Sequence, residues 1–218
     1  MTFKKVRTAI LISGRGSNMQ SLVEAAQADD YPAEIVLIAS NRPDAAGLEW
    51  AKARGLPTLA IDHKKYKTRD AFEAALQDAL AAAGTELVAL AGFMRLMTSD
   101  FVEHWRDRMI NIHPSLLPSF KGLHTHERAL AAGVKIAGCT VHFVRTEMDE
   151  GPIIGQAAVP VLSGDDPATL AARVLAAEHR LYAASLKLVA SGLARVEGEK
   201  VITLHESNPG LPIYSPSL

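Results

Sequence analysis

Short apolar runs alternate with stretches in which apolar residues recur at helical spacing through the first half of the chain. Four runs predict buried strands of a parallel sheet, at residues 8–12, 34–40, 56–61 and 86–91. Each run is followed by a segment typical of a helix, at residues 19–26, up to Ala53, at 71–83 and at 99–105. Pro57 places the third strand at an edge of the sheet, because proline cannot donate to a neighbouring strand.

The pattern changes in the second half of the chain. A strand is expected to end near residue 113, and the next strand, at 138–144, alternates polar and apolar residues, which predicts one face toward a site or solvent. A turn at 149–152 then leads into an antiparallel strand at 153–161. The remaining expected elements are a short helix at 127–132, a long helix from Pro167 to about Ser191, and a hairpin at 193–204 that turns at Gly198.

This order of elements predicts an α/β fold. We expect a doubly wound, mostly parallel sheet with helices on both faces and antiparallel strands in the C-terminal half. A length of 218 residues suits a single domain, which we assign to residues 1–218. The division expected within it is a phosphate-binding half at about 1–100, a catalytic and folate-binding half at about 101–205 and a loosely attached tail at 206–218.

Composition excludes several classes of protein. The formal net charge is −1, which gives no reason to expect nucleic-acid binding, and no apolar run is long enough to span a membrane. Cys139 is the only cysteine, so neither a disulfide framework nor a cysteine-based zinc site is expected. The N-terminus lacks the features of a signal peptide, and a cytoplasmic location is the default expectation.

Candidate chemistry begins at the strand that precedes Pro114. Side chains alternate along a strand, so Asn111 and His113 point to the same side, and Pro114 stops regular pairing just beyond them. An amide can donate to a developing oxyanion, and an imidazole can donate to it or move a proton. The alternative is a satisfied polar pair at the end of a strand.

A glycine-rich turn, Ser-Gly-Arg-Gly-Ser-Asn at 13–18, joins the first strand to the first helix. Such a turn lets backbone N–H groups face an anion, and Ser17 is either the N-cap or a direct phosphate ligand. Met19 breaks the dinucleotide fingerprint, and no Gly-Lys-Ser/Thr follows, so a monophosphate fits better than a dinucleotide or triphosphate. An ordinary turn with a capped helix is the alternative.

Topology brings these separate stretches together. Right-handed crossovers place the carboxyl ends of the first, fourth and fifth strands on one rim of the sheet. That rim would carry residues 14–18, the pair Met94 and Arg95, and residues 111–113. The long loop at 114–126 adjoins the rim, and long loops in compact domains tend to be functional.

Five motifs together resemble the phosphoribosylglycinamide formyltransferase family. They are the turn at 13–18, Ala-Gly-Phe-Met-Arg-Leu at 91–96, Asn-Ile-His-Pro-Ser-Leu-Leu-Pro at 111–118, Gly-Leu-His-Thr-His at 122–126 and Met-Asp-Glu-Gly-Pro at 148–152. They occur in the order of the family, and the similarity spans roughly residues 6–195. The turn at 13–18 and the motif at 122–126 separate this family from related transferases and hydrolases that act on 10-formyltetrahydrofolate.

The resemblance implies a Rossmann-like formyltransferase of purine biosynthesis. It would transfer the formyl group of 10-formyltetrahydrofolate, a co-substrate, to the amine of phosphoribosylglycinamide, as a monomer or homodimer with no tightly bound cofactor and no metal. The implied catalytic residues are Asn111, His113 and Asp149. The implied phosphoribosylglycinamide-binding residues are Gly16, Ser17, Asn18 and Glu178, and the implied folate-binding residues are Arg69, Met94, Arg95, Leu96, Met97 and Asn111.

The implied residues suit a tetrahedral intermediate. Asn111 would donate to the oxyanion, and His113 would stabilise it and help to move a proton toward the departing folate nitrogen. Asp149 would favour the imidazolium form of His113 and fix its tautomer, although an aspartate in a turn is otherwise common. His142 alternates toward the same face and is expected to give a supporting hydrogen bond.

Two other functions remain open at this point. A formyltetrahydrofolate hydrolase could use the same three residues on water, and a mononucleotide-binding regulator would use the glycine-rich turn without catalysis. The turn argues against the hydrolase, and the intact trio argues against the regulator. A metal pair formed by His124 and His126 is a weaker alternative, because no third ligand stands nearby in the sequence.

Overall fold

The computed structural model describes residues 4–204 and Ser215. The strands are β1 (Val6–Ile12), β2 (Ala33–Ser40), β3 (Thr58–Ala60), β4 (Leu87–Leu90), β5 (Met109–His113), β6 (Ile136–Phe143), β7 (Ile153–Pro160), β8 (Ala194–Glu197) and β9 (Lys200–Thr203). The helices are α1 (Ser17–Ala26), α2 (Ala46–Lys52), α3 (Arg69–Ala82), α4 (Ser99–His104), α5 (Thr125–Ala131) and α6 (Pro167–Ala190). A 3₁₀ turn at His63–Lys65 lies within the connection after β3.

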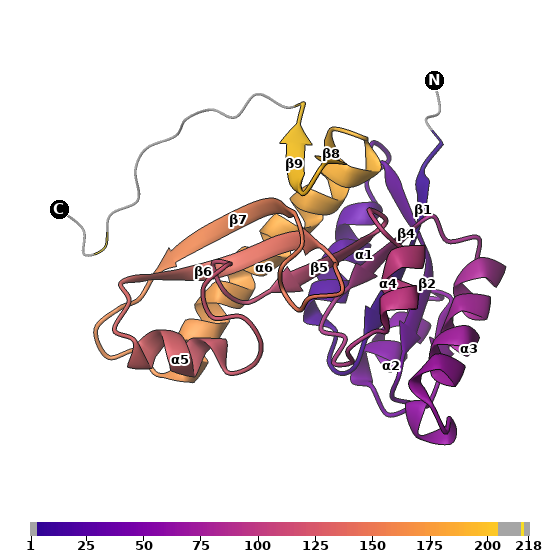
Figure 1. Cartoon of the computed structure of the whole chain (residues 1–218), viewed down its shortest axis with the longest axis horizontal. Helices are drawn as coiled ribbons and strands as arrows, with labels where there is room; N and C mark the ends of the chain where they lie inside the picture. The colour runs from indigo at the N-terminus through magenta and orange to yellow at the C-terminus, as the bar shows by residue number, and fades with distance from the viewer. Residues whose placement is uncertain (1–3, 205–214, 216–218) are drawn as a thin grey trace.

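Seven strands form one sheet in the order β3-β2-β1-β4-β5-β6-β7, and β8 and β9 form a separate hairpin (Figure 1). The pairs from β3 to β5 are parallel, whereas β6 is antiparallel to both β5 and β7. The expected α/β class, the edge position of β3 and the antiparallel C-terminal strands are therefore confirmed.

Helices cover both faces of the sheet because neighbouring strand residues point in opposite directions. Ile10 and Ile12 of β1 pack in the core formed with α1, α2, α5 and α6, whereas Ala9 and Leu11 pack in the second core formed with α3 and α4. Figure 1 shows the long helix α6 passing behind β6 and β7. The buried runs in the sequence thus correspond to strands with a core on each side.

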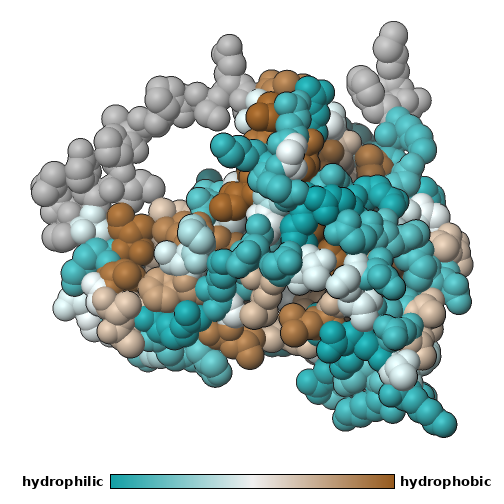
Figure 2. Space-filling view, in the orientation of Figure 1, coloured by the Kyte–Doolittle hydropathy of each residue, from teal (hydrophilic) through white to brown (hydrophobic). Residues whose placement is uncertain are grey.

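The surface differs between the two ends of the molecule in this view. Figure 2 shows hydrophilic residues over α3 and α4. Hydrophobic residues gather near the start of β6 and the end of β7, which lie side by side. Leu162, which follows β7, is 52% exposed. On the face of β6 that carries Thr140, the segment at 114–119 supplies a cover, because the Leu117 N–H donates to Thr140 Oγ1 over 3.0 Å.

Helix ends differ from the expectation at two places. Helix α5 begins at Thr125, before the expected residue 127, because His124 in a left-handed conformation precedes it. Helix α1 has Gly16 as its N-cap with a φ of 72° and no side-chain cap, so the N-cap interpretation of Ser17 is wrong. Ser17 is instead the first helical residue.

The C-terminal elements follow the pattern closely. Asp166 caps α6 by accepting the Thr169 N–H over 2.7 Å, and the β8–β9 hairpin turns at Gly198, whose φ is 65°. The expected tail at 206–218 lies, apart from Ser215, outside the described residues. Within residues 4–204, no helix combines the length and the apolar character needed to cross a membrane.

Candidate active site

The carboxyl ends of β1, β4 and β5 lie side by side in the sheet (Figure 1). From β1 the chain proceeds to β2 and β3 on one side and then to β4 and β5 on the other, so the topological switch lies between β1 and β4. Open α/β sheets bind ligands in the crevice at such a switch. The three stretches expected on one rim are brought together here.

The side chains of His113 and Asp149 meet at the end of β5. Asp149 Oδ2 lies 3.4 Å from His113 Nδ1, and the two side chains are only 8% and 9% exposed. Asn111 lies on the same side of β5 and joins the group through His142, whose Nε2 is 3.2 Å from Asn111 Nδ2 and 3.9 Å from Asp149 Oδ1. The structure therefore brings the three sequence-predicted catalytic residues together, with His142 between two of them.

Both nitrogens of the His113 ring face acceptors. Nδ1 faces the Asp149 carboxylate, and Nε2 lies 3.1 Å from the carbonyl oxygen of Phe120. Neutral imidazole has only one N–H, whereas imidazolium has two. Each ring nitrogen of His113 therefore has an acceptor to which it can donate when it carries a proton.

Asp149 is fixed by its backbone as well as by its partners. Its φ of 59° is left-handed, and its Oδ2 accepts the Gly122 N–H over 2.8 Å. A side chain at Gly151 would place its Cβ 1.7 Å from the carbonyl oxygen of Phe143, so only glycine lets the turn pack against the end of β6. The turn therefore presents the carboxylate in one position.

His142 is buried and holds Asn111. Burial lowers the pKa of His142, and its Nδ1 donates to the carbonyl oxygen of Phe143 over 2.9 Å. Nε2 of this neutral tautomer, inferred from the partners, accepts one N–H of the Asn111 amide. The other amide N–H is left for an oxyanion, and the supporting hydrogen bond expected of His142 is confirmed.

The segment after Pro114 is tied to the sheet by a partly buried polar cluster. Thr140 Oγ1 donates to the Ser115 carbonyl over 2.7 Å and accepts from Gln156 Nε2 over 3.0 Å. Gln156 Nε2 also donates to the Leu117 carbonyl over 2.9 Å. Thr140 pairs with His113 in the β5–β6 register, so this cluster holds the loop directly beside His113.

The N-terminus of α1 is open to an anion. The first N–H groups of a helix have no intrahelical partner, and α1 has neither a side-chain cap nor an acidic residue in its first turn. Gly47 closes the other side of the turn, because its N–H donates to the Gly14 carbonyl over 3.0 Å and a Cβ there would lie 3.1 Å from that oxygen. Gly16 and Ser17 are therefore in position for a phosphate.

Asn18 and Glu178 are joined across α1 and α6. Asn18 Nδ2 donates to Glu178 Oε2 over 2.7 Å, and Glu178 is only 6% exposed. Burial raises the pKa of the Glu178 carboxyl above its ordinary value, and the hydrogen bond from Asn18 offsets only part of this rise. Asn18 Oδ1 is buried, and no donor among the described residues reaches it. The two residues that the family resemblance assigns to one substrate are thus in contact.

The turn after β4 presents an apolar surface at the rim. Met94 and Leu96 are 64% and 61% exposed, whereas Met97 packs against the core on the α3 and α4 side. The guanidinium of Arg95 lies 5.3 Å from the centroid of the Phe72 ring on α3. Of the four residues at 94–97, only Met94 and Leu96 therefore offer exposed apolar side chains to a ligand.

Arg69 stands at the start of α3, and α3 is fastened to the turn after β4. The buried carboxylate of Glu73 accepts the Thr98 N–H over 2.9 Å and also accepts from the Thr98 hydroxyl. Arg69 and Glu73 are four residues apart and share one face of the helix. The exposed Arg69 is consequently on the side of α3 that faces the turn.

Several groups at the site were missed by the sequence analysis. The Phe120 carbonyl and the Gly122 N–H hold His113 and Asp149, and backbone groups leave no trace in the identity of a side chain. Thr140 could have been found, because it occupies a polar position in the alternating strand. Nothing in the sequence pattern around Gln156 indicated a role at the site.

His124 and His126 do not point to a common site. The exposed His124 has its Nδ1 3.6 Å from Glu127 Oε1, whereas His126 lines a cavity behind the loop at 114–120. Burial lowers the pKa of His126. In the part of the chain that the structure describes, no group of three His, Cys, Asp or Glu side chains is arranged to hold a metal ion.

Known proteins provide an independent comparison. A profile of the formyl transferase family matches residues 6–186. The trifunctional purine biosynthetic protein adenosine-3 of Bos taurus is 50% identical over 193 residues, which make up 88% of this chain but 19% of that protein. The chain therefore spans about a fifth of the length of such curated relatives.

Shorter relatives match over most of their own length. The phosphoribosylglycinamide formyltransferase of Escherichia coli (strain K12) is 40% identical over 183 residues, covering 84% of this chain and 86% of that protein. The crystal structure of glycinamide ribonucleotide transformylase 1 from Symbiobacterium toebii superposes with a TM-score of 0.89 and 46% identity, covering 92% of this chain and 95% of that one. The profile, the sequence identities and the shared fold agree, and the chain belongs to the formyl transferase family.

Proposed function

We propose that this chain transfers the formyl group of 10-formyltetrahydrofolate to the amine of 5'-phosphoribosylglycinamide in purine biosynthesis, the reaction of EC 2.1.2.2. The observation that carries the proposal is the buried contact between His113 and Asp149, beside Asn111 and on the same rim as the open N-terminus of α1. The family membership and the names of the relatives support the same reaction. The folate acts as a co-substrate.

The proposed reaction begins with attack of the substrate amine on the formyl carbon. The new C–N bond gives a tetrahedral oxyanion, which receives the free N–H of Asn111 and the Nε2–H of His113, a donor that the oxyanion shares with the Phe120 carbonyl. His113 gives a proton to the folate nitrogen as the bond from carbon to that nitrogen breaks, and the imidazole then takes the proton that the attacking amine loses. The products are the formylated amine and tetrahydrofolate, and His113 returns to its starting form. Asp149 keeps the His113 ring oriented and favours its charged form.

Binding is assigned to the two ends of the rim. Gly16 and Ser17 would hold the phosphate through the backbone of α1, and Asn18 and Glu178 would contact the same substrate. Met94, Arg95, Leu96, Met97 and Asn111 would line the folate pocket, with Arg69 near the pterin or glutamate end. The cytoplasmic location, the monomeric or homodimeric state and the division into two functional halves stay predictions.

Product analysis tests this proposal. With both substrates present, we expect formylated phosphoribosylglycinamide to accumulate, as measured by mass spectrometry. Glycinamide riboside, which lacks the phosphate, is the matched control and should react poorly because it cannot use the N-terminus of α1. Equal rates with the two amines would remove the phosphate site from the proposal, and no product from either would reject the function.

Exhaustive chelation is expected to leave the activity unchanged. Asn111 and His113 already supply the donors that an oxyanion needs, and His113 can carry the proton. The measurement is the rate of formyl transfer after dialysis against a chelator. A loss of activity that a divalent metal ion restores would contradict this mechanism.

A further inference from the structure

Phe120 combines an unusual backbone conformation with a contact to the proposed catalytic histidine. Its φ of 54° lies in the left-handed region, which residues with a bulky side chain rarely adopt. In this conformation its carbonyl oxygen lies 3.1 Å from His113 Nε2. A strained conformation persists only when the surroundings hold it, and such residues cluster at functional sites.

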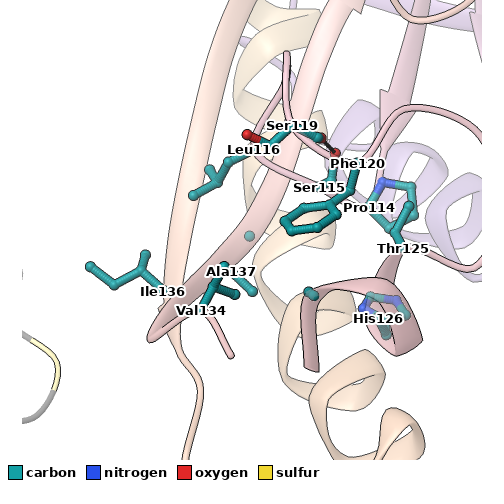
Figure 3. A pocket seen from close by; sticks show the side chains of 12 residues that line it. Pro114, Ser115, Leu116, Ser119, Phe120, Thr125, His126, Val134, Ile136 and Ala137 are labelled. Atoms are coloured by element: carbon teal, nitrogen blue, oxygen red, sulfur yellow. Dashed lines mark hydrogen bonds between the residues drawn. The ribbon is translucent and has the colours of Figure 1, made fainter. Parts of the chain in front are cut away.

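The residues on each side of Phe120 are held by separate hydrogen bonds. The Ser115 hydroxyl donates to the Ser119 carbonyl over 2.6 Å, a bond drawn in Figure 3, and Arg128 donates to the Lys121 carbonyl. The Gly122 N–H donates to Asp149. These bonds fix the ends of the short segment. Only the peptide groups of Phe120 itself can still change their orientation.

The partly buried Phe120 ring packs against the core between the loop, α5 and β6, and it borders a cavity of about 110 Å³ (Figure 3). Val134, Ala137 and Ala129 are among the apolar residues that line this cavity. The Arg128 guanidinium lies 5.7 Å from the centroid of the ring. The ring is therefore the part of Phe120 that can hold its backbone in place.

We propose that Phe120 is a positioning residue for the formyl transfer proposed above: its ring, packed against the core beside this cavity, keeps its carbonyl aimed at His113 Nε2. Without the ring, the left-handed conformation has no packing to offset its strain, and the carbonyl turns away. His113 then keeps Asp149 as its partner but loses the acceptor on the other side. The inference rests on the proposed function, because the imidazole is the group being positioned.

The test compares Phe120→Ala with Phe120→Tyr. For Phe120→Ala we expect kcat to fall by about tenfold or more, since small misplacements of a catalytic group can cost about 10²-fold, while both KM values change little. Phe120→Tyr keeps a ring and should retain most of the activity. The second readout is the NMR signal of the His113 Nε2–H, which should be lost or shifted in Phe120→Ala.

Val134→Ala is the matched control, because it enlarges the same cavity without touching the backbone that contacts His113. It should lower stability and leave kcat and the His113 signal as in the wild type. A folded Phe120→Ala protein with kcat within twofold of the wild type and an unchanged His113 signal would overturn the inference. If Phe120→Ala fails to fold, Phe120→Leu replaces it with the same criteria. Absence of transfer by the wild type would instead reject the proposed function.

Discussion

Replacement of Asp149 by asparagine is expected to lower kcat by about 10²–10⁴-fold, the usual contribution of general acid–base catalysis. Asparagine keeps the size of the side chain but removes the charge 3.4 Å from His113 Nδ1. The carboxylate orients the imidazole and makes no contact with the turn at 13–18 or with residues 94–97, which are the proposed binding segments. Both KM values should therefore change far less than kcat. Steady-state kinetics with each substrate varied in turn give the measurement.

Glu150→Gln is the control for this substitution. It removes one negative charge from the same turn, but Glu150 pairs with Lys121 at 2.7 Å and does not contact His113. Its kcat should stay near that of the wild type. If Asp149→Asn also keeps a near-normal turnover between about pH 6 and 9, Asp149 is only a residue of the turn.

The second large effect is expected from Ser17→Asp. The new carboxylate would stand in the first turn of α1, where the structure leaves N–H groups free and the proposal places a phosphate. Repulsion between the two anions should raise KM for the phosphorylated amine by at least about tenfold, a cost of about 1.4 kcal/mol. KM for the folate should stay within about twofold, and α1 itself should be stabilised, because an acidic residue suits a helix N-terminus.

Ser21→Asp adds the same charge one turn further along α1 and serves as the control. Interactions with the helix terminus fall off within the first turn, so its effect on the amine KM should be much smaller. Equal losses of affinity for both substrates in Ser17→Asp would mean a general distortion of the rim. No loss for either substrate would place the phosphate elsewhere.

Much of the fold could be predicted because apolar periodicity reflects burial directly. Alternation along β5 was sufficient to place Asn111 and His113 on one side of a strand, and the sheet order then set them beside the turns after β1 and β4. The alternating polar positions of β6 likewise predicted that His142 faces the site. These inferences depend on the regular geometry of strands, because that geometry produces the alternating pattern of residues in the sequence.

The details that escaped prediction depend on the backbone. Phe120 and Asp149 have positive φ values without being glycine, and nothing in their identity signals it. The cap of α1 was misassigned because Gly16 takes the position that serine commonly occupies. The pairing of Asp149 with His113 came from the family resemblance alone, since a contact across distant segments leaves no periodic signal.

The central claim is that an amine, not water, receives the formyl group. A hydrolase could use Asn111, His113 and Asp149 equally well, because both reactions pass through a tetrahedral oxyanion. A transferase must also hold the amine beside the formyl carbon, and the open N-terminus of α1 provides an anchor for it. The measurement follows formate and formylated amine together in one reaction. We predict little formate from 10-formyltetrahydrofolate alone and rapid formyl transfer once phosphoribosylglycinamide is added, whereas formate release at a comparable rate without the amine would contradict the account.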